Sequence, residues 1–149
     1  MQLDKMEFED FNPLDFLELS CELNSEVLEL KSSSSSVKRT IFSRTYYAVF
    51  IFLRELLSDN TDYISNPYGE HRRLPNFIER KGPFCGNINE VVAKDINILK
   101  KLRHQSDYYL EVPSKGTKEY NNWLFYNTDY AIDVANRIIT LFKKHFKNS

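Results

Sequence analysis

Glycine, proline and cysteine are all scarce in this sequence. Its 149 residues include four glycines, five prolines and two cysteines. The glycines stand in no GxGxxG or P-loop spacing, so a glycine-rich phosphate loop is excluded. Cys21 and Cys85 lie far apart and form no CxxC pair, which predicts free thiols in a reducing compartment. The two cysteines and three histidines follow no ligand spacing, so neither a metal nor a cofactor is expected.

Long apolar runs and a charge excess are missing as well. The longest unbroken apolar run, YYAVFIFL, is far shorter than the roughly 20 residues that cross a bilayer. The acidic start, MQLDKMEFED, lacks the basic and apolar regions of a signal peptide, so a soluble, cytoplasmic protein without a membrane partner is expected. A net charge of −1 gives no whole-surface attraction to nucleic acid, so any anion site must be local. The length predicts a single domain over residues 1–149.

The apolar residues recur with helical periodicity, which predicts an all-α fold. We expect an antiparallel up-and-down bundle of four long helices and one short helix. The expected helices cover residues from about 13–31, 36–58, 71–81, 88–111 and 118–147. Asn12 suits the cap of the first helix and Ser36, the last residue of SSSSS, that of the second. Pro75 argues against helix in the first half of the short one.

Two of these helices have clear apolar patterns. The second is apolar on nearly every side between Ile41 and Leu53, which is typical of the central helix of a bundle. The last helix has a set of apolar residues at core spacing: Trp123, Tyr130, Val134, Ile138 and Leu141.

Two arginines fall among these apolar side chains. At about 100° per residue, Arg44 projects between Ile41 and Ala48, and Arg103 lies within the apolar stripe of the fourth helix. We therefore expect both arginines to point inward and to need an anionic partner, because an unpaired buried guanidinium is costly. Asp107 is the expected partner, either of Arg103 one turn earlier or of Arg44 across the bundle. Hydroxyl groups for the same network can come from Tyr46, Tyr47 and Tyr108.

Three stretches follow one another in order: SRTYYAVF, then GEHRRLPNFI, then LKKLRHQSDYY. Their combination resembles the HEPN superfamily of higher-eukaryote and prokaryote nucleotide-binding domains, and most closely its small stand-alone prokaryotic branch. The resemblance covers residues from about 40 to 110, and the matching positions are Ser43, Arg44, Tyr46, Tyr47, Ala48, His71, Phe77, Arg103, Asp107 and Tyr108.

The resemblance implies a helical bundle, commonly a homodimer, and often one half of a toxin–antitoxin pair with a small nucleotidyltransferase. Many HEPN proteins are metal-independent RNases that use an Arg and a His about four to six residues apart as cation and proton carrier. This chain departs from that pattern, because His104 follows Arg103 immediately. Adjacent helical residues point about 100° apart, so His104 is expected to face solvent. His71 can replace the missing histidine only if it folds back over Arg44 or Arg103.

Three interpretations stay open. The first is a nucleotide-, RNA- or partner-binding module whose ligand-binding residues are Arg44, Tyr47, His71, Arg103, Asp107 and Tyr108. The second is an RNase toxin in which His71 or His104 acts with Arg103 or Arg44. In the third, the role is purely structural: the arginines form an internal clasp, and the interaction surface lies on other residues such as Trp123, Phe125, Tyr126 and Tyr130.

Overall fold

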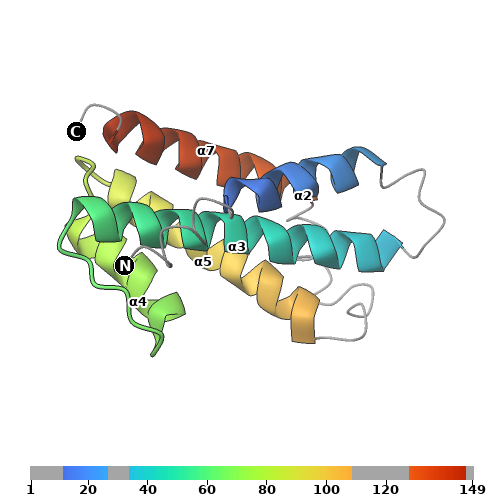
Figure 1. Cartoon of the computed structure of the whole chain (residues 1–149), viewed down its shortest axis with the longest axis horizontal. Coiled ribbons are helices and arrows are strands. Elements are labelled where there is room, and N and C mark those ends of the chain that lie inside the picture. Colours follow the sequence, from blue (N-terminus) through green and yellow to red (C-terminus); the bar gives the residue numbers. More distant parts are fainter. Residues whose placement is uncertain (1–11, 27–33, 109–127, 147–149) are drawn as a thin grey trace.

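The computed structural model describes residues 12–26, 34–108 and 128–146. These residues form five helices packed as a bundle and contain no strand, which confirms the all-α prediction (Figure 1). The helices are α2 (Leu14–Glu26), α3 (Ser34–Asn60), α4 (Glu70–Lys81), α5 (Ile88–Tyr108) and α7 (Thr128–Phe146).

The long helix α3 is the centre of the bundle, as its sequence predicts. It contacts α2, α4, α5 and α7. Ile41, Val49 and Leu53 are completely buried along it. Each fully buried side chain of this size stabilises the fold by about 1.5–3 kcal/mol, so α3 supplies a large part of the driving force for folding.

Asn12 and Ser36 were expected to cap the first two helices. The backbone N–H of Leu14 donates to Oδ1 of Asn12 over 3.0 Å, so the expected cap at Asn12 is confirmed. The expectation that Ser36 caps the second helix is wrong, because α3 already begins at Ser34. The Ser36 carbonyl instead accepts a hydrogen bond from the Thr40 hydroxyl over 3.0 Å. Serine is only mildly unfavourable in a helix, so the first turn extends into the serine run.

Pro75 does not interrupt α4, which corrects the expectation of a doubtful first half. The helix is continuous from Glu70 to Lys81, and Pro75 is buried inside it. Proline has no N–H to offer the carbonyl four residues earlier, which here belongs to His71. Lys100 of α5 donates its Nζ to that carbonyl over 3.5 Å. The His71 carbonyl, which Pro75 cannot bond, is thus used in a contact that ties α4 to α5.

The turn between α4 and α5 is held by one side chain. Nδ2 of Asn89 donates to the carbonyls of Gly82 and Phe84 over 3.0 and 2.9 Å, and its Oδ1 accepts from the Phe84 N–H over 3.1 Å. A Cβ at position 82 would collide with Oδ1 of Asn89 and the Ile78 carbonyl, so only glycine fits there. These contacts fix α4 alongside α5 (Figure 1).

The last helix closes the core. Val134, Ile138 and Phe142 of α7 are buried, and Leu141 and Tyr130 pack against them, as their spacing predicts. The expected core residue Trp123, together with Phe125 and Tyr126, lies outside the described residues. Within the part of the chain that the structure describes, no helix is both long enough and apolar enough to cross a membrane.

Candidate functional site

Two neighbouring tyrosines of α3 reach two different helices. Oη of Tyr46 and Nδ1 of His71, at the start of α4, are 2.6 Å apart. Nη2 of Arg103, on α5, donates to Oη of Tyr47 over 2.7 Å. Because Tyr46 and Tyr47 are adjacent, with ring centroids 5.6 Å apart, they hold His71 and Arg103 beside each other. We call these four residues and Lys100 the His71–Arg103 site.

Arg103 is bound by α5 and α3 together. Its Nε lies 2.8 Å from Oδ2 of Asp107, so the ion pair expected within this helix is confirmed. Its guanidinium also lies over the Tyr47 ring, 5.0 Å from the centroid. The side chain keeps 16% of its surface exposed, so it is neither sealed in the core nor free in solvent. The guanidinium is therefore held in a fixed position at the edge of the core.

The imidazole of His71 is fixed from two sides. It stacks on Phe50, with centroids 4.2 Å apart, and meets Tyr46 through Nδ1. Burial lowers the pKa of His71, and the positive charges of Arg103 and Lys100 lower it further. Burial raises the pKa of Tyr46 well above its usual value, so this hydroxyl keeps its proton. The Tyr46 hydroxyl can donate to Nδ1 or accept from Nδ1–H, and in the tautomer to which it donates the imidazole proton lies on Nε2.

Glu70 fixes the loop that presents His71. It is 5% exposed, and its carboxylate accepts hydrogen bonds from the Tyr63 hydroxyl and the Asn66 N–H, both over 2.9 Å. Nη1 of Arg54 lies 3.9 Å and Nη2 of Arg73 3.6 Å from its oxygens. A carboxylate at the first turn of a helix is also favoured by the helix dipole. The start of α4, and with it His71, is thus anchored to the preceding loop and to α3.

The site has more positive than negative charge around His71. Burial lowers the pKa of the Lys100 ammonium, and nearby Arg72 lowers it further. Asp107 is engaged by Arg103, and Glu70 by the loop and its arginines. No described group of three or more His, Cys, Asp or Glu side chains could hold a metal ion. The arrangement suits a phosphate group, which would bring the missing negative charge.

Arg44 does not belong to this site, which corrects the expectation of an inward arginine shared with Asp107. It is exposed, and its guanidinium lies over the Phe16 ring of α2, 4.9 Å from the centroid. Although Ile41 and Ala48 on either side are buried, the flexible stem of Arg44 crosses the edge of α2 and carries the charge into solvent. The polar centre of α3 is formed by the tyrosines that follow it.

Two further residues were expected at the site from the sequence, and two others were not. His104 is exposed, as its place opposite the apolar stripe predicts. Tyr108 is the last residue of α5, and its side chain lies outside what the structure describes. Lys100 was not singled out by sequence reasoning, although it precedes Arg103 by three residues and so lies on the same face of α5. Glu70 was also missed, and its signal was an acidic residue at the start of a helix.

Arg39, near the start of α3, stabilises the end of α5. Its Nη1 donates to the carbonyl of Ser106 over 3.0 Å and lies 3.4 Å from that of Gln105. The last carbonyls of a helix have no partner within it, so an arginine there stabilises the end of the helix. Arg39 thereby secures the turn of α5 that carries Asp107.

Comparisons with known proteins give one distant relative. The chain is 29% identical over 136 residues to the uncharacterized protein MJ0628 of Methanocaldococcus jannaschii, in an alignment that spans 84% of this chain and 79% of that protein. No family model and no solved structure matches the chain. This small all-helical protein is thus a distant homologue of MJ0628, and the comparisons assign it to no family.

Proposed function

We propose that this protein is a HEPN-like module that binds the phosphate group of a nucleotide or an RNA at the His71–Arg103 site. The observation that carries the proposal is the pair of contacts made by adjacent tyrosines: Tyr46 to His71, and Tyr47 to Arg103. The motif that suggested a HEPN-like protein in the sequence contains both tyrosines. The same motif therefore supplies the platform on which two possible phosphate ligands meet.

The hydrogen-bonding capacity of the site favours binding. When Nδ1 of His71 accepts from Tyr46, the Nε2–H is left as a donor. Lys100 and Arg103 add an ammonium and a guanidinium, and arginine pairs with phosphate through two parallel hydrogen bonds. The oxygens of a phosphodiester are acceptors, so these three donors favour its binding.

RNA cleavage is a second candidate function. It is favoured by one observation: His71, brought from α4, lies beside Arg103 of α5 and feels its charge, which lowers the His71 pKa. A neutral imidazole beside a guanidinium can move a proton while the cation stabilises charge that develops on the phosphate. The Tyr46 hydroxyl can either donate or accept, so it can follow a change of tautomer. A homodimer and a nucleotidyltransferase partner, which the HEPN resemblance implies, are further predictions.

The experiment that tests the proposal measures binding and cleavage in one sample. Fluorescently labelled single-stranded RNA is titrated with the full chain in the presence of EDTA, and anisotropy gives the Kd while a denaturing gel reports cleavage. The variants are Lys100→Ala and Arg103→Lys. The matched control is Lys101→Ala, which removes an exposed cation from the same helix.

We expect the Kd to rise by roughly 10- to 150-fold in Lys100→Ala and to change little in the control, since one charge-assisted hydrogen bond contributes about 1.5–3 kcal/mol. Equal losses in Lys100→Ala and Lys101→Ala would show diffuse attraction to a basic surface and would refute the site. RNA products that end in a 2′,3′-cyclic phosphate and vanish in Arg103→Lys would favour the second candidate.

A further inference from the structure

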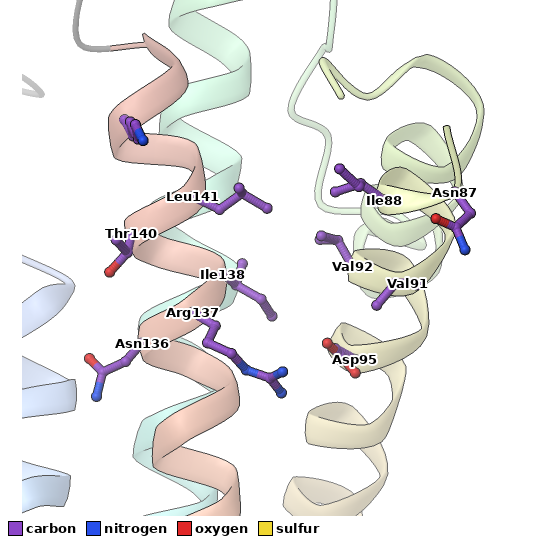
Figure 2. Close-up of a pocket in the computed structure, with 11 residues that line it drawn as sticks. Asn87, Ile88, Val91, Val92, Asp95, Asn136, Arg137, Ile138, Thr140 and Leu141 are labelled. Carbon is purple, nitrogen blue, oxygen red and sulfur yellow. The ribbon is translucent and has the colours of Figure 1, made fainter. Parts of the chain in front are cut away.

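An apolar groove runs between the first half of α5 and the second half of α7, toward the opposite end of α5 from Arg103 (Figure 2). Both helices pack on α3 far more than on each other, which leaves the seam between them open. The groove has a volume of about 580 Å³, within the range of about 300–1,000 Å³ that is typical of small-molecule sites. Its apolar walls are formed by Ile88, Val91 and Val92 of α5 and by Ile138 and Leu141 of α7.

The apolar middle of the groove is open to solvent. Ile138 and Leu141 of α7 point across it toward Val92 of α5 (Figure 2). Ile88 is 42% exposed and Val91 48% exposed, which is high for apolar residues on a helix that packs into the core. An apolar molecule in the groove would remove this surface from water, which is the main driving force for binding such molecules.

One end of the groove has opposite charges on its two walls. Arg137 of α7 and Asp95 of α5 extend toward each other at the same level (Figure 2). Burial raises the pKa of Asp95, and the positive charges of Arg137 and Lys94 lower it. The charge of this carboxylate is therefore met by cations of its own chain, so this end of the groove offers no unmatched charge to a ligand.

The other end of the groove has a cation and no opposing carboxylate. Lys144 lies two helical turns after Arg137, so it is on the same face of α7, about 10 Å along the axis. Leu141 and Ile88 lie on the same side of the Arg137–Asp95 pair, so the α5 wall is apolar toward Lys144 (Figure 2). Among the residues that the structure describes, no acidic side chain forms an ion pair with Lys144. The groove is thus an apolar slot with an unmatched cation at one end.

We propose that this groove binds a free, unbranched fatty acid of about eight to ten carbons. The carboxylate meets the Lys144 ammonium, and the alkyl chain lies between the walls of α5 and α7 and ends near Arg137 and Asp95. Two cations and one carboxylate line the groove, so a single negative charge balances it. The distance of about 10 Å from Lys144 to Arg137 fits a chain of about eight carbons. A much longer chain would have to desolvate the charged pair.

The fatty-acid site is independent of the phosphate site. Arg103 lies eight residues after Asp95 on α5, about 12 Å along the helix axis, and does not line the groove. Loss of RNA binding in the variants of the His71–Arg103 site would therefore leave the fatty-acid site unaffected, and the reverse also holds.

Calorimetric titration of the full chain with sodium decanoate, below its micelle concentration, tests the site. We expect one decanoate to bind per chain with a Kd below about 1 mM. Lys144→Gln removes the charge and keeps most of the side chain, and it should raise the Kd at least about fivefold. The matched control is Lys143→Gln, which removes the neighbouring exposed lysine outside the groove and should leave the Kd within about twofold.

Two further comparisons make the test specific to the charge and to the groove. Decanol has the same chain without the carboxylate, so it should bind wild type and Lys144→Gln equally. Val91→Asp places a carboxylate in the groove and should abolish decanoate binding, with the fold of each variant verified by circular dichroism. An absence of saturable binding to the wild type, equal losses in the two lysine variants, full binding by Val91→Asp, or tighter binding of tetradecanoate than of decanoate would overturn the proposal.

Discussion

Tyr46 of α3 and His71 of α4 are joined by a hydrogen bond of 2.6 Å between Oη and Nδ1, at the point where α4 starts to pack on the bundle. Tyr46 is completely buried, and His71 is half-buried. The bond connects the core of the protein with a titratable group at its surface. It holds the imidazole in one orientation and occupies Nδ1, so Nε2 is the ring nitrogen left for a ligand.

Tyr46→Phe removes this hydroxyl and keeps the ring. We expect the free energy of unfolding to fall by about 1–2 kcal/mol, because Nδ1 of His71 loses its hydrogen-bond partner inside the structure. Urea unfolding followed by circular dichroism gives the value. Tyr68→Phe, at a tyrosine that is 84% exposed, is the matched control and should have no effect. Equal stability of the wild type and Tyr46→Phe would contradict the assigned role of the bond.

The lowered pKa of His71 predicts that stability depends on pH. The unfolded chain binds a proton at His71 near its ordinary pKa of 6.5, whereas the folded chain binds it only at lower pH. The contribution of His71 to stability is therefore complete above pH 6.5 and is lost as the pH falls from 6.5 toward the folded-state pKa. Urea midpoints for wild type and His71→Gln across this range should converge at low pH. Parallel curves would refute the shift.

Glu70→Gln tests the anchor of α4. The amide keeps the size of the side chain but turns donors toward the Tyr63 hydroxyl or the Asn66 N–H, which both need an acceptor. We expect a loss of about 1–3 kcal/mol in urea unfolding. Glu79→Gln, an exposed glutamate on the same helix, should cost little. A small loss in Glu70→Gln, similar to that of the control, would show that the loop does not depend on this carboxylate.

Arg44→Ala tests whether the exposed Arg44 takes part in binding at the His71–Arg103 site. Its contact with Phe16 is a cation–π pair at the surface, so a cost below about 1 kcal/mol is expected. RNA affinity should stay within about twofold of wild type, because Arg44 lies against α2 and not beside His71. Anisotropy with labelled RNA checks this. A large loss of affinity would return Arg44 to the ligand-binding residues.

Periodicity was sufficient to predict the fold and the central position of α3, because burial on nearly every side leaves few places for a helix in a bundle. Periodicity failed for Arg44, since a helical projection gives the direction of Cβ but not the path of a long side chain that ends in solvent. The prediction that Pro75 disturbs the first half of α4 was wrong for a different reason. The acceptor that it leaves at His71 meets Lys100 of another helix, which no local rule for helix breakers includes.

The site was partly visible in the sequence. The pair of Arg103 and Asp107 follows from their spacing on one helix, and the structure confirms it. The proximity of His71 to Arg103 depends on the conformation of the loop before α4. Glu70 holds that loop through its hydrogen bonds to Tyr63 and Asn66. Contacts between helices of this kind are not encoded in any local spacing.

The most direct test of the phosphate site is an NMR titration of the three histidines. The pKa values of His71, His104 and His145 are measured from their ring protons, without ligand and with saturating adenosine monophosphate. His104 and His145 are exposed and serve as internal controls. A phosphate that accepts a hydrogen bond from Nε2–H of His71 favours the charged imidazole, so the pKa of His71 should rise and the other two should stay unchanged. An unchanged His71, or an equal rise at all three histidines, would contradict a phosphate site at His71 and Arg103.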